Sequence, residues 1–290
     1  MELIFENQNG QRLDLLNNRK YFKLTAAEGL HGIDTAFSET ESPYTDGVTL
    51  DNVRALPRGI ALKFALCGDV AAGLDFFHGF VKSKQLGKLI KREGARETKI
   101  EGRVTVPPYS RTSDRVAVEL HLYCGQPYWE DVQELVGTIA ELVDLLYFPE
   151  IGRGFPEEGV PFGALNIEKA QTFANDGDVS VGLTIVINSL GTVANPRISC
   201  STGTQNGWYM QLNATLNDGD EVVISTHRGN KSITINGRAY INGVPILSLL
   251  EYSGDDWLQL ETGENTFNIT SDTDSPKVYF NIYFSRRWER

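Results

Sequence analysis

Short runs of alternating apolar and polar residues fill the last hundred residues of the chain, and this feature most constrains its fold. From Val179 onward apolar residues recur two apart, and Gly, Asn and Asp separate successive runs. A period of two is that of a β-strand with one buried face. Turn signals such as Asn236-Gly237 stand between runs, which is typical of an antiparallel sandwich. We therefore predict a β-sandwich over residues 165–290. Its predicted core residues include Trp208, Leu212, Ile224, Ile235, Trp257, Ile269 and Ile282.

The first half of the chain mixes strand and helix patterns. Residues 26–58 are rich in Gly, Ser and Thr with weak periodicity, so we interpret them as mostly loop, of a length usual for functional or interface-forming loops. Residues 74–92 have helical spacing. The predicted strands are residues 2–5, 12–16, 21–24, 59–66, 98–106 and 115–123. The basic residues of the helical segment indicate a solvated face, or alternatively a partner-binding patch: Lys82, Lys84, Lys88, Lys91 and Arg92.

The clearest helical pattern covers residues 130–147, where apolar residues fall at i, i+3, i+4 and i+7. Acidic residues in its first turn suit the positive end of a helix dipole, and Pro149 would end it. The apolar stripe is Val132, Leu135, Val136, Ile139, Leu142, Val143 and Leu146.

A stretch rich in Gly and Pro, residues 148–164, follows the predicted helix and indicates a connector between domains. We therefore predict an N-terminal domain over residues 1–147 and a C-terminal domain over residues 165–290. The predicted fold class is mainly β. It comprises an N-terminal β-sandwich-like domain with an accessory helix, a linking amphipathic helix and a C-terminal antiparallel β-sandwich.

Charge and composition narrow the classes of partner. The net charge of −11 disfavours adsorption to phosphate backbones or anionic lipid, although an acidic protein can line a channel through which nucleic acid slides. No apolar run of about 18 residues is present, so we predict no membrane span. The N-terminus lacks the pattern of a signal peptide, so we expect synthesis in a cytoplasm without export by such a signal. The three cysteines are scattered and indicate small buried hydrophobes: Cys67, Cys124 and Cys200.

Residue patterns for chemistry are absent from the sequence. None of the four histidines has a partner at metal or triad spacing: His31, His78, His121 and His227. The segments Asp218-Gly-Asp220 and Asp272-Thr-Asp274 lack the further ligands of an EF-hand loop, so we interpret them as turns rather than calcium sites. Nothing selects a catalytic pair among the acidic residues, including Glu157-Glu158 and Asp255-Asp256. We predict no enzymatic activity, no catalytic, cofactor-binding or metal-binding residues, and no cofactor.

Aromatic residues in the second half offer one alternative. They would suit a sugar-stacking platform on a sandwich, but the two tryptophans are in phase with core residues, which favours packing. The four residues concerned are Trp208, Tyr209, Tyr252 and Trp257.

Several short motifs follow one another along the chain. In the first half they are Pro57-Arg58-Gly59-Ile60 and Cys124–Trp129. In the second half they are Leu190–Ile198, Leu216–Ile224, Ile233–Gly237, Leu247–Leu250, Trp257–Asn265 and Phe280–Arg287. The order of these motifs resembles that of siphophage distal tail proteins, the Dit family. The resemblance covers nearly the whole chain, with extra residues in the 148–178 connection.

This resemblance implies a structural role at the tail tip of a virion. It implies a hexameric ring closed by N-terminal domains, with galectin-like C-terminal sandwiches projecting outward. Its implied partners are the tail tube protein, a tail-tip hub or tail-associated lysin, and a receptor-binding protein, without specific binding of nucleic acid or membrane. A carbohydrate-binding module for host attachment is the alternative. The sequence leaves open the host, the receptor, and whether the element is a phage, a prophage or a tail-derived bacteriocin.

Overall fold

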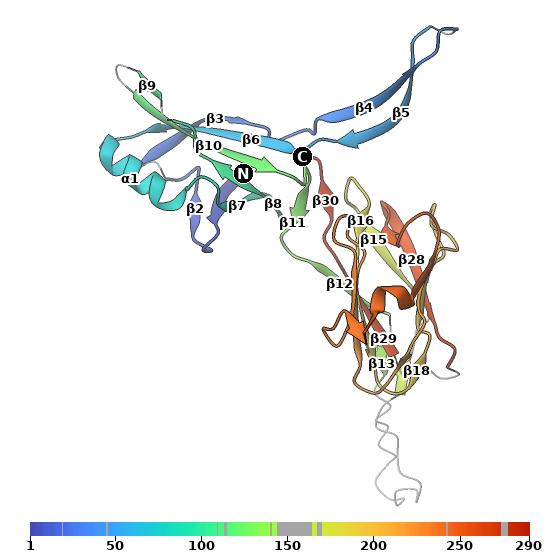
Figure 1. The fold of residues 1–290 in the computed structure, drawn as a ribbon. Coiled ribbons are helices and arrows are strands. Elements are labelled where there is room, and N and C mark those ends of the chain that lie inside the picture. The colour runs from blue at the N-terminus through green and yellow to red at the C-terminus, as the bar shows by residue number, and fades with distance from the viewer. Residues whose placement is uncertain are drawn as a thin grey trace, which may run out of the picture. The chain divides into compact units, whose positions relative to one another are not determined.

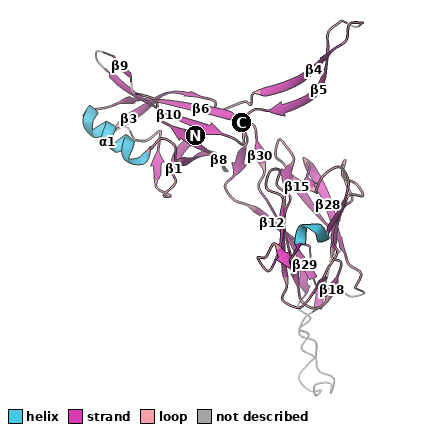
Figure 2. Ribbon diagram, viewed as in Figure 1, coloured by secondary structure: helices cyan, strands magenta, loops and turns pink. Residues whose placement is uncertain are grey.

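The chain folds into two units, described here by a computed structural model (Figure 1). Unit 1 comprises Met1–Gln133 and Arg287–Arg290, and unit 2 comprises Glu134–Arg286. The mainly β class is confirmed, because strands dominate both units (Figure 2). The structure describes residues 1–18, 20–44, 46–108, 110–112, 115–139, 141–143, 164–166, 170–241, 243–273 and 278–290.

Unit 1 is built on one antiparallel sheet with the order β2-β1-β7-β8-β10-β6-β3. Three short strands extend it: β9 pairs with β10, and β11 pairs with both β8 and β30. The main strands are β1 (Glu2–Asn7), β2 (Arg12–Asp14), β3 (Phe22–Glu28), β6 (Arg58–Leu66), β7 (Leu86–Glu93), β8 (Arg96–Thr105) and β10 (Arg115–Cys124). The short strands are β9 (Ser110–Thr112), β11 (Trp129–Asp131) and β30 (Arg287–Trp288).

One helix, α1 (Val70–Phe80), packs against the core of this sheet. Asp69 caps its N-terminus by accepting a hydrogen bond from the Ala71 amide, 2.9 Å away. The ring of Phe77 is fully buried, 5.8 Å from the ring of Phe64. The accessory helix was thus predicted correctly in kind but not in extent. The second half of the predicted segment is strand β7, because it pairs with β8 along its whole length and with β1 over residues 87–92.

Unit 2 is a sandwich of two five-stranded antiparallel sheets, which confirms the C-terminal prediction. One sheet has the order β12-β29-β17-β22-β23, and the other β15-β28-β19-β20-β26. The core residues named above are buried except Trp208, which is half-buried and packs against the core. The first sheet consists of β12 (Leu135–Ile139), β17 (Thr184–Ser189), β22 (Glu221–Ser225), β23 (Ser232–Ile235) and β29 (Val278–Phe284). The second consists of β15 (Ala170–Asn175), β19 (Arg197–Cys200), β20 (Tyr209–Leu212), β26 (Leu250–Ser253) and β28 (Gly263–Thr270).

Short strand pairs and one 3-10 helix, η1 (Ile246–Leu249), complete unit 2. The paired strands are β13 (Glu141–Val143) with β14 (Ala164–Asn166), β16 (Val181–Gly182) with β27 (Gln259–Leu260), β18 (Val193–Ala194) with β21 (Thr215–Leu216), and β24 (Tyr240–Ile241) with β25 (Val244–Pro245).

The predicted linking helix at 130–147 is wrong over the described residues, which form β11, β12 and β13; residues 144–147 lie outside the described part. Strand β12 pairs with β29 along its whole length. Ile139 is fully buried whereas Val136 is 58% exposed, as the alternation of a strand requires. The Phe173 ring packs directly against the backbone of Gly137, where any Cβ would collide with it.

The boundary between the units also differs from the predicted one. It falls between Gln133 and Glu134, so β12 belongs to unit 2 and the last four residues belong to unit 1. The physical reason is pairing: β12 joins the sheet of unit 2, and β30 joins the sheet of unit 1. Most of the predicted connector, residues 148–163, lies outside the described residues.

Residues 26–58, predicted as mostly loop, are instead largely strand. Strand β3 continues to Glu28, and a hairpin follows from β4 (Thr35–Glu41) and β5 (Val48–Ala55). In the described ranges, no helix is both long enough and apolar enough to cross a membrane.

Candidate interaction surface

The β4–β5 hairpin, residues 35–55, is called the arm below. Its two strands pair with each other as a separate two-stranded sheet, and it extends away from the main sheet of unit 1 (Figure 1). An isolated two-stranded hairpin is only marginally stable in water. Among the described residues, no third strand pairs with the arm.

A β-bulge gives the arm one apolar face. The register pairs Ser38 with Asn52 and then Glu39 with Leu50, which leaves Asp51 as the extra residue. Without this shift Leu50 and Val53 would point to opposite sides, because side chains alternate along a strand. With it, four large apolar residues follow one face, hereafter the apolar face: Phe37, Val48, Leu50 and Val53.

The apolar face is open to solvent. Phe37 is 51% exposed, Leu50 53% and Val53 63%. Clustered exposed apolar side chains mark sites of protein contact. Glu39 and Glu41 share this face by register, so a partner must accommodate both apolar and acidic groups. Sequence reasoning marked residues 26–58 as a functional or interface-forming loop, but it missed the hairpin and its apolar face.

The base of the arm is fixed within unit 1. Gly29, at φ +74°, crosses so close to Gly59 that a Cβ would collide with the Gly59 carbonyl oxygen. The Leu30 carbonyl oxygen accepts hydrogen bonds from Arg58 Nη1 and Trp129 Nε1, each at 3.1 Å. Burial lowers the pKa of the Arg58 guanidinium, since desolvation disfavours its charged form.

A second buried cation, Lys91, lies near this base. Its side chain is 3% exposed. Its Nζ atom lies 3.9 Å from a Glu93 carboxylate oxygen and 4.8 Å from the centre of the Trp129 ring. Burial lowers the pKa of Lys91, opposed by Glu93 and reinforced by the positive charges of Arg58 and Arg96.

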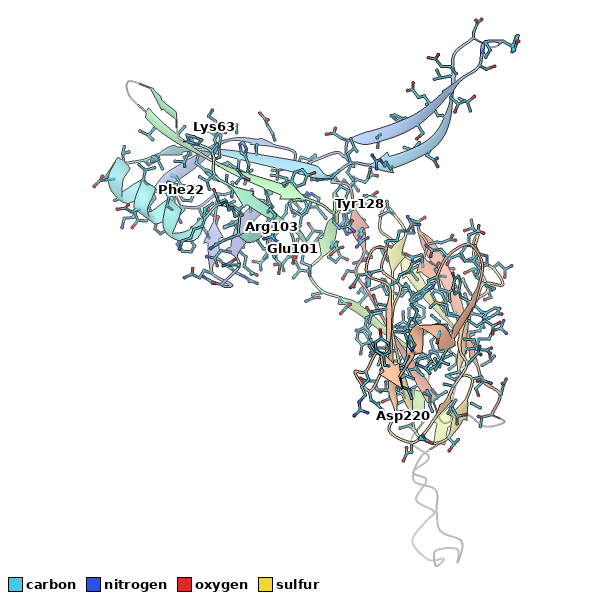
Figure 3. The ribbon with its side chains drawn as sticks, in the orientation of Figure 1. Phe22, Lys63, Glu101, Arg103, Tyr128 and Asp220 are labelled. Carbon is cyan, nitrogen blue, oxygen red and sulfur yellow. The ribbon has the colours of Figure 1, made fainter. Side chains whose placement is uncertain are left out.

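The basic residues predicted on one solvated helical face are therefore dispersed. Lys88 pairs with Glu6 and Glu101, and Arg92 pairs with Glu2 and Glu97. Lys91 is buried, while Lys82 and Lys84 are exposed and pair with no acidic residue among those described. The paired residues belong to a charged sheet face on which Figure 3 labels Lys63, Glu101 and Arg103.

The motif residues of unit 2 hold turns rather than line a site. Asn265 donates to the carbonyl oxygens of Glu261 and Gly263 and accepts from the Glu261 amide at 2.9 Å. Asp220, labelled in Figure 3, accepts from the Asn217 amide at 2.7 Å and from Asn236 Nδ2 at 2.8 Å. These bonds lower the pKa of Asp220, the Asn217 amide contributing most.

The other predicted candidates do not converge on a site. Asp272 accepts from Asn195 Nδ2 at 2.7 Å, while Asp274 lies outside the described residues. No group of three or more His, Cys, Asp or Glu residues in the described part is placed to hold a metal ion. His121 lies 3.0 Å from Glu119, and His227 lies 3.3 Å from the Thr184 hydroxyl.

The four aromatic residues of the sugar-platform alternative are mostly engaged. Trp257 is 5% exposed, and Trp208 packs against the core. The guanidinium of Arg197 covers the Tyr209 ring at 3.6 Å, and Tyr252 alone of the four is 48% exposed. The structure therefore does not present them as one open stacking surface.

Comparison with known proteins places this fold. Residues 176–288 match the sequence model of a family described as the siphovirus-type tail component, C-terminal domain. The resemblance to siphophage distal tail proteins is confirmed. The Dit protein of phage SPP1 has the same fold, with a TM-score of 0.63, 12% identity and 98% coverage of both chains. Its structure is described as a paradigm of the hub adsorption apparatus in phages that infect Gram-positive bacteria.

Two further solved structures are more distant. They are the phage p2 baseplate in its activated conformation with strontium and with calcium, each with a TM-score of 0.47 and 8% identity. Coverage is 98% of this chain and 97% of that chain in the first, and 97% of both in the second. No curated protein matches the chain. The distal tail likeness therefore rests on the family match in unit 2 and on the SPP1 fold.

Proposed function

We propose that the chain is a structural distal tail protein whose copies close a hexameric ring through unit 1. The ring joins the tail tube to the baseplate or tail-tip hub, and the protein has no enzymatic activity. The family match and the SPP1 fold support the tail role. The observation that carries the ring is the apolar face of the arm, because it is exposed on unit 1 and lacks a cover among the described residues.

Closed cyclic symmetry explains how such a surface is satisfied. In a ring each copy contacts the next copy through one patch and the previous copy through a second patch, so no interface is left unpaired. The further partners are the tail tube protein, the hub or a tail-associated lysin, and a receptor-binding protein docked on unit 2. The net charge of −11 supports passage of DNA through the bore, since an acidic wall repels phosphate. The place of action is the tail tip of the virion, after synthesis in the cytoplasm of the bacterial host.

Mass photometry and negative-stain imaging test the ring. We expect six copies for the full chain and a six-fold ring in images. The double variant Phe37→Asp/Val53→Asp should lower the mass to that of a monomer, because it charges the apolar face. The double variant Ser38→Asp/Asn52→Asp changes the opposite face of the arm and should keep the ring. Monomers alone at every concentration, with no ring in purified tail tips, would refute the proposal.

A further inference from the structure

A hollow in unit 1 has the shape and chemistry to receive the arm. Its volume is about 480 Å³, and it is open to solvent. Buried Val81 and Val118 form its floor, each 1% exposed. The remaining lining comes from the end of α1, the turn after it and the segment that follows β8: His78, Lys82, Ser83, Val106, Pro107 and Pro108. This receiving surface is named the hollow below.

We propose that the arm of one copy seats its apolar face in the hollow of the next copy, an inference that rests on the proposed ring. The occupant is thus a second copy of this chain. Three independent features of unit 1 support it: apolar complementarity, charge complementarity and position.

The arm and the hollow are complementary in their apolar side chains. The arm presents two valines, a leucine and a phenylalanine on one face, and the hollow presents valine and proline side chains. The apolar face of the arm is exposed, and around the buried floor of the hollow Pro108 is exposed while Val106 and Pro107 are partly exposed. Burying both removes apolar area from water, which is the main driving force of association.

The charges on the arm and around the hollow favour a second copy of this chain over a partner that is only apolar. Glu39 and Glu41 lie on the apolar face, and Asp46 lies in the exposed turn between the strands. At the other surface, Lys82 lines the hollow and Lys84 lies two residues further along. Both lysines are exposed and unpaired among the described residues, whereas Lys88 is already paired with Glu6 and Glu101. An acidic arm and a basic rim attract each other and fix the register of the contact.

The arm and the hollow lie at opposite ends of unit 1. Strands β6 and β10 pair Arg58 with Cys124 at the base of the arm, and Phe64 with Val118 at the hollow. Six residues of strand separate these pairs, which is roughly 20 Å. A donor at one end and an acceptor at the other produce a head-to-tail contact, which builds a closed ring or an open filament rather than a two-fold dimer. Figure 1 shows the arm and α1 at the two ends of this sheet.

Site-specific crosslinking tests the contact directly. Val53→Cys on the arm and Ser83→Cys in the hollow are made in separate full-length chains that also carry Cys67→Ser. The chains are mixed and treated with a short bismaleimide. We expect a covalent Val53-to-Ser83 dimer in the mixture and a ladder ending at six copies when one chain carries both changes. Leu190→Cys, also exposed but in unit 2, replaces the hollow cysteine as the control and should give no dimer.

Charge reversal gives a second measure. Glu39→Lys or Lys82→Glu alone should weaken ring assembly about tenfold or more, because like charges meet across the contact. The two changes in one chain should restore assembly to within about threefold. Arg238→Glu in unit 2 matches the charge change of Lys82→Glu and should leave assembly unchanged.

The outcomes separate the two proposals. A six-fold ring without the Val53-to-Ser83 crosslink and without charge rescue overturns the arm-in-hollow contact and leaves the ring standing. Absence of both ring and crosslink overturns both proposals. A ring with crosslink and rescue establishes the contact.

Discussion

Arg58 donates a hydrogen bond from Nη2 to the carbonyl oxygen of Glu289, 2.7 Å away. The two residues are 231 positions apart, yet both belong to unit 1. The same guanidinium bonds Leu30 at the base of the arm. Through this one side chain the returning end of the chain is joined to the base of the arm.

Trp288 anchors that returning end. Its ring is buried, its Nε1 donates to Asp131 at 2.9 Å, and Arg96 stacks on it at 3.6 Å. We expect Trp288→Ala to destabilise unit 1 by about 3–5 kcal/mol, the usual cost of removing a large buried aromatic. Hydrogen exchange of the full chain should show the loss of protection in unit 1.

The control for this prediction is Arg290→Ala, since Arg290 is exposed at the same end of the chain. It should leave hydrogen exchange in unit 1 unchanged. Equal protection in Trp288→Ala and wild-type protein would show that residues 287–290 are not part of the unit 1 fold.

Because of Lys91, we expect the free energy of unfolding to depend on pH in the alkaline range. Its folded-state pKa is lowered from 10.5 by burial, opposed by Glu93 and reinforced by Arg58, Arg96 and Arg290. Between the lowered pKa and 10.5 the unfolded chain binds the proton and the folded chain does not. Stability therefore rises with pH across this window and is flat below it.

Lys91→Met tests this expectation, because it keeps the length of the side chain and removes the charge. The free energy of unfolding, measured in urea from pH 7 to pH 10.5, should rise more steeply for the wild type than for the variant. Removing the buried charge should also stabilise the protein at pH 7 by about 1 kcal/mol or more. Parallel pH profiles for the two proteins would contradict the lowered pKa.

Strand β12 yields a test that separates strand from helix. Ile139 is fully buried in the core of unit 2, whereas Val136 is 58% exposed. We expect Ile139→Asp to unfold unit 2, since burying an unpaired carboxylate costs several kcal/mol. Val136→Asp should fold normally, as judged by circular dichroism and thermal unfolding. In a helix the two residues would share a face, so equal damage from both changes would favour the helix.

The contrast between β12 and the C-terminal strands shows what the sequence can reveal. In β29 the alternation of Val278, Phe280 and Ile282 has one interpretation, because apolar residues recur two apart through the whole strand. In β12 the residues Leu135 and Ile139 satisfy a helical spacing and an alternating one equally well. Pairing with β29 decides between them, and that pairing is a long-range contact that no local pattern contains.

The arm and Lys91 were hidden for different reasons. The bulge at Asp51 shifts the phase of alternation between Leu50 and Val53, so a regular pattern never develops. This change in the alternation is the sequence signal from which a bulged hairpin could have been predicted. Lys91 stands among exposed basic residues in the sequence, and its burial beside the Trp129 ring comes from tertiary packing that no local pattern contains.

The alternative of a glycan-binding unit 2 leads to the last prediction. Sugars stack on open aromatic faces, but Arg197 already covers Tyr209, and both Trp208 and Trp257 pack in the core region. The Tyr209 hydroxyl is committed as well, since it donates to Glu251 at 2.7 Å. We expect the full chain to show no sub-millimolar binding on a glycan array. Binding to one sugar class that Tyr209→Ala or Tyr252→Ala removes, with folding unchanged by circular dichroism, would establish a host-attachment role for this sheet. A Tyr279→Ala variant, on the other sheet of the sandwich, is the matched control and should not affect any such binding.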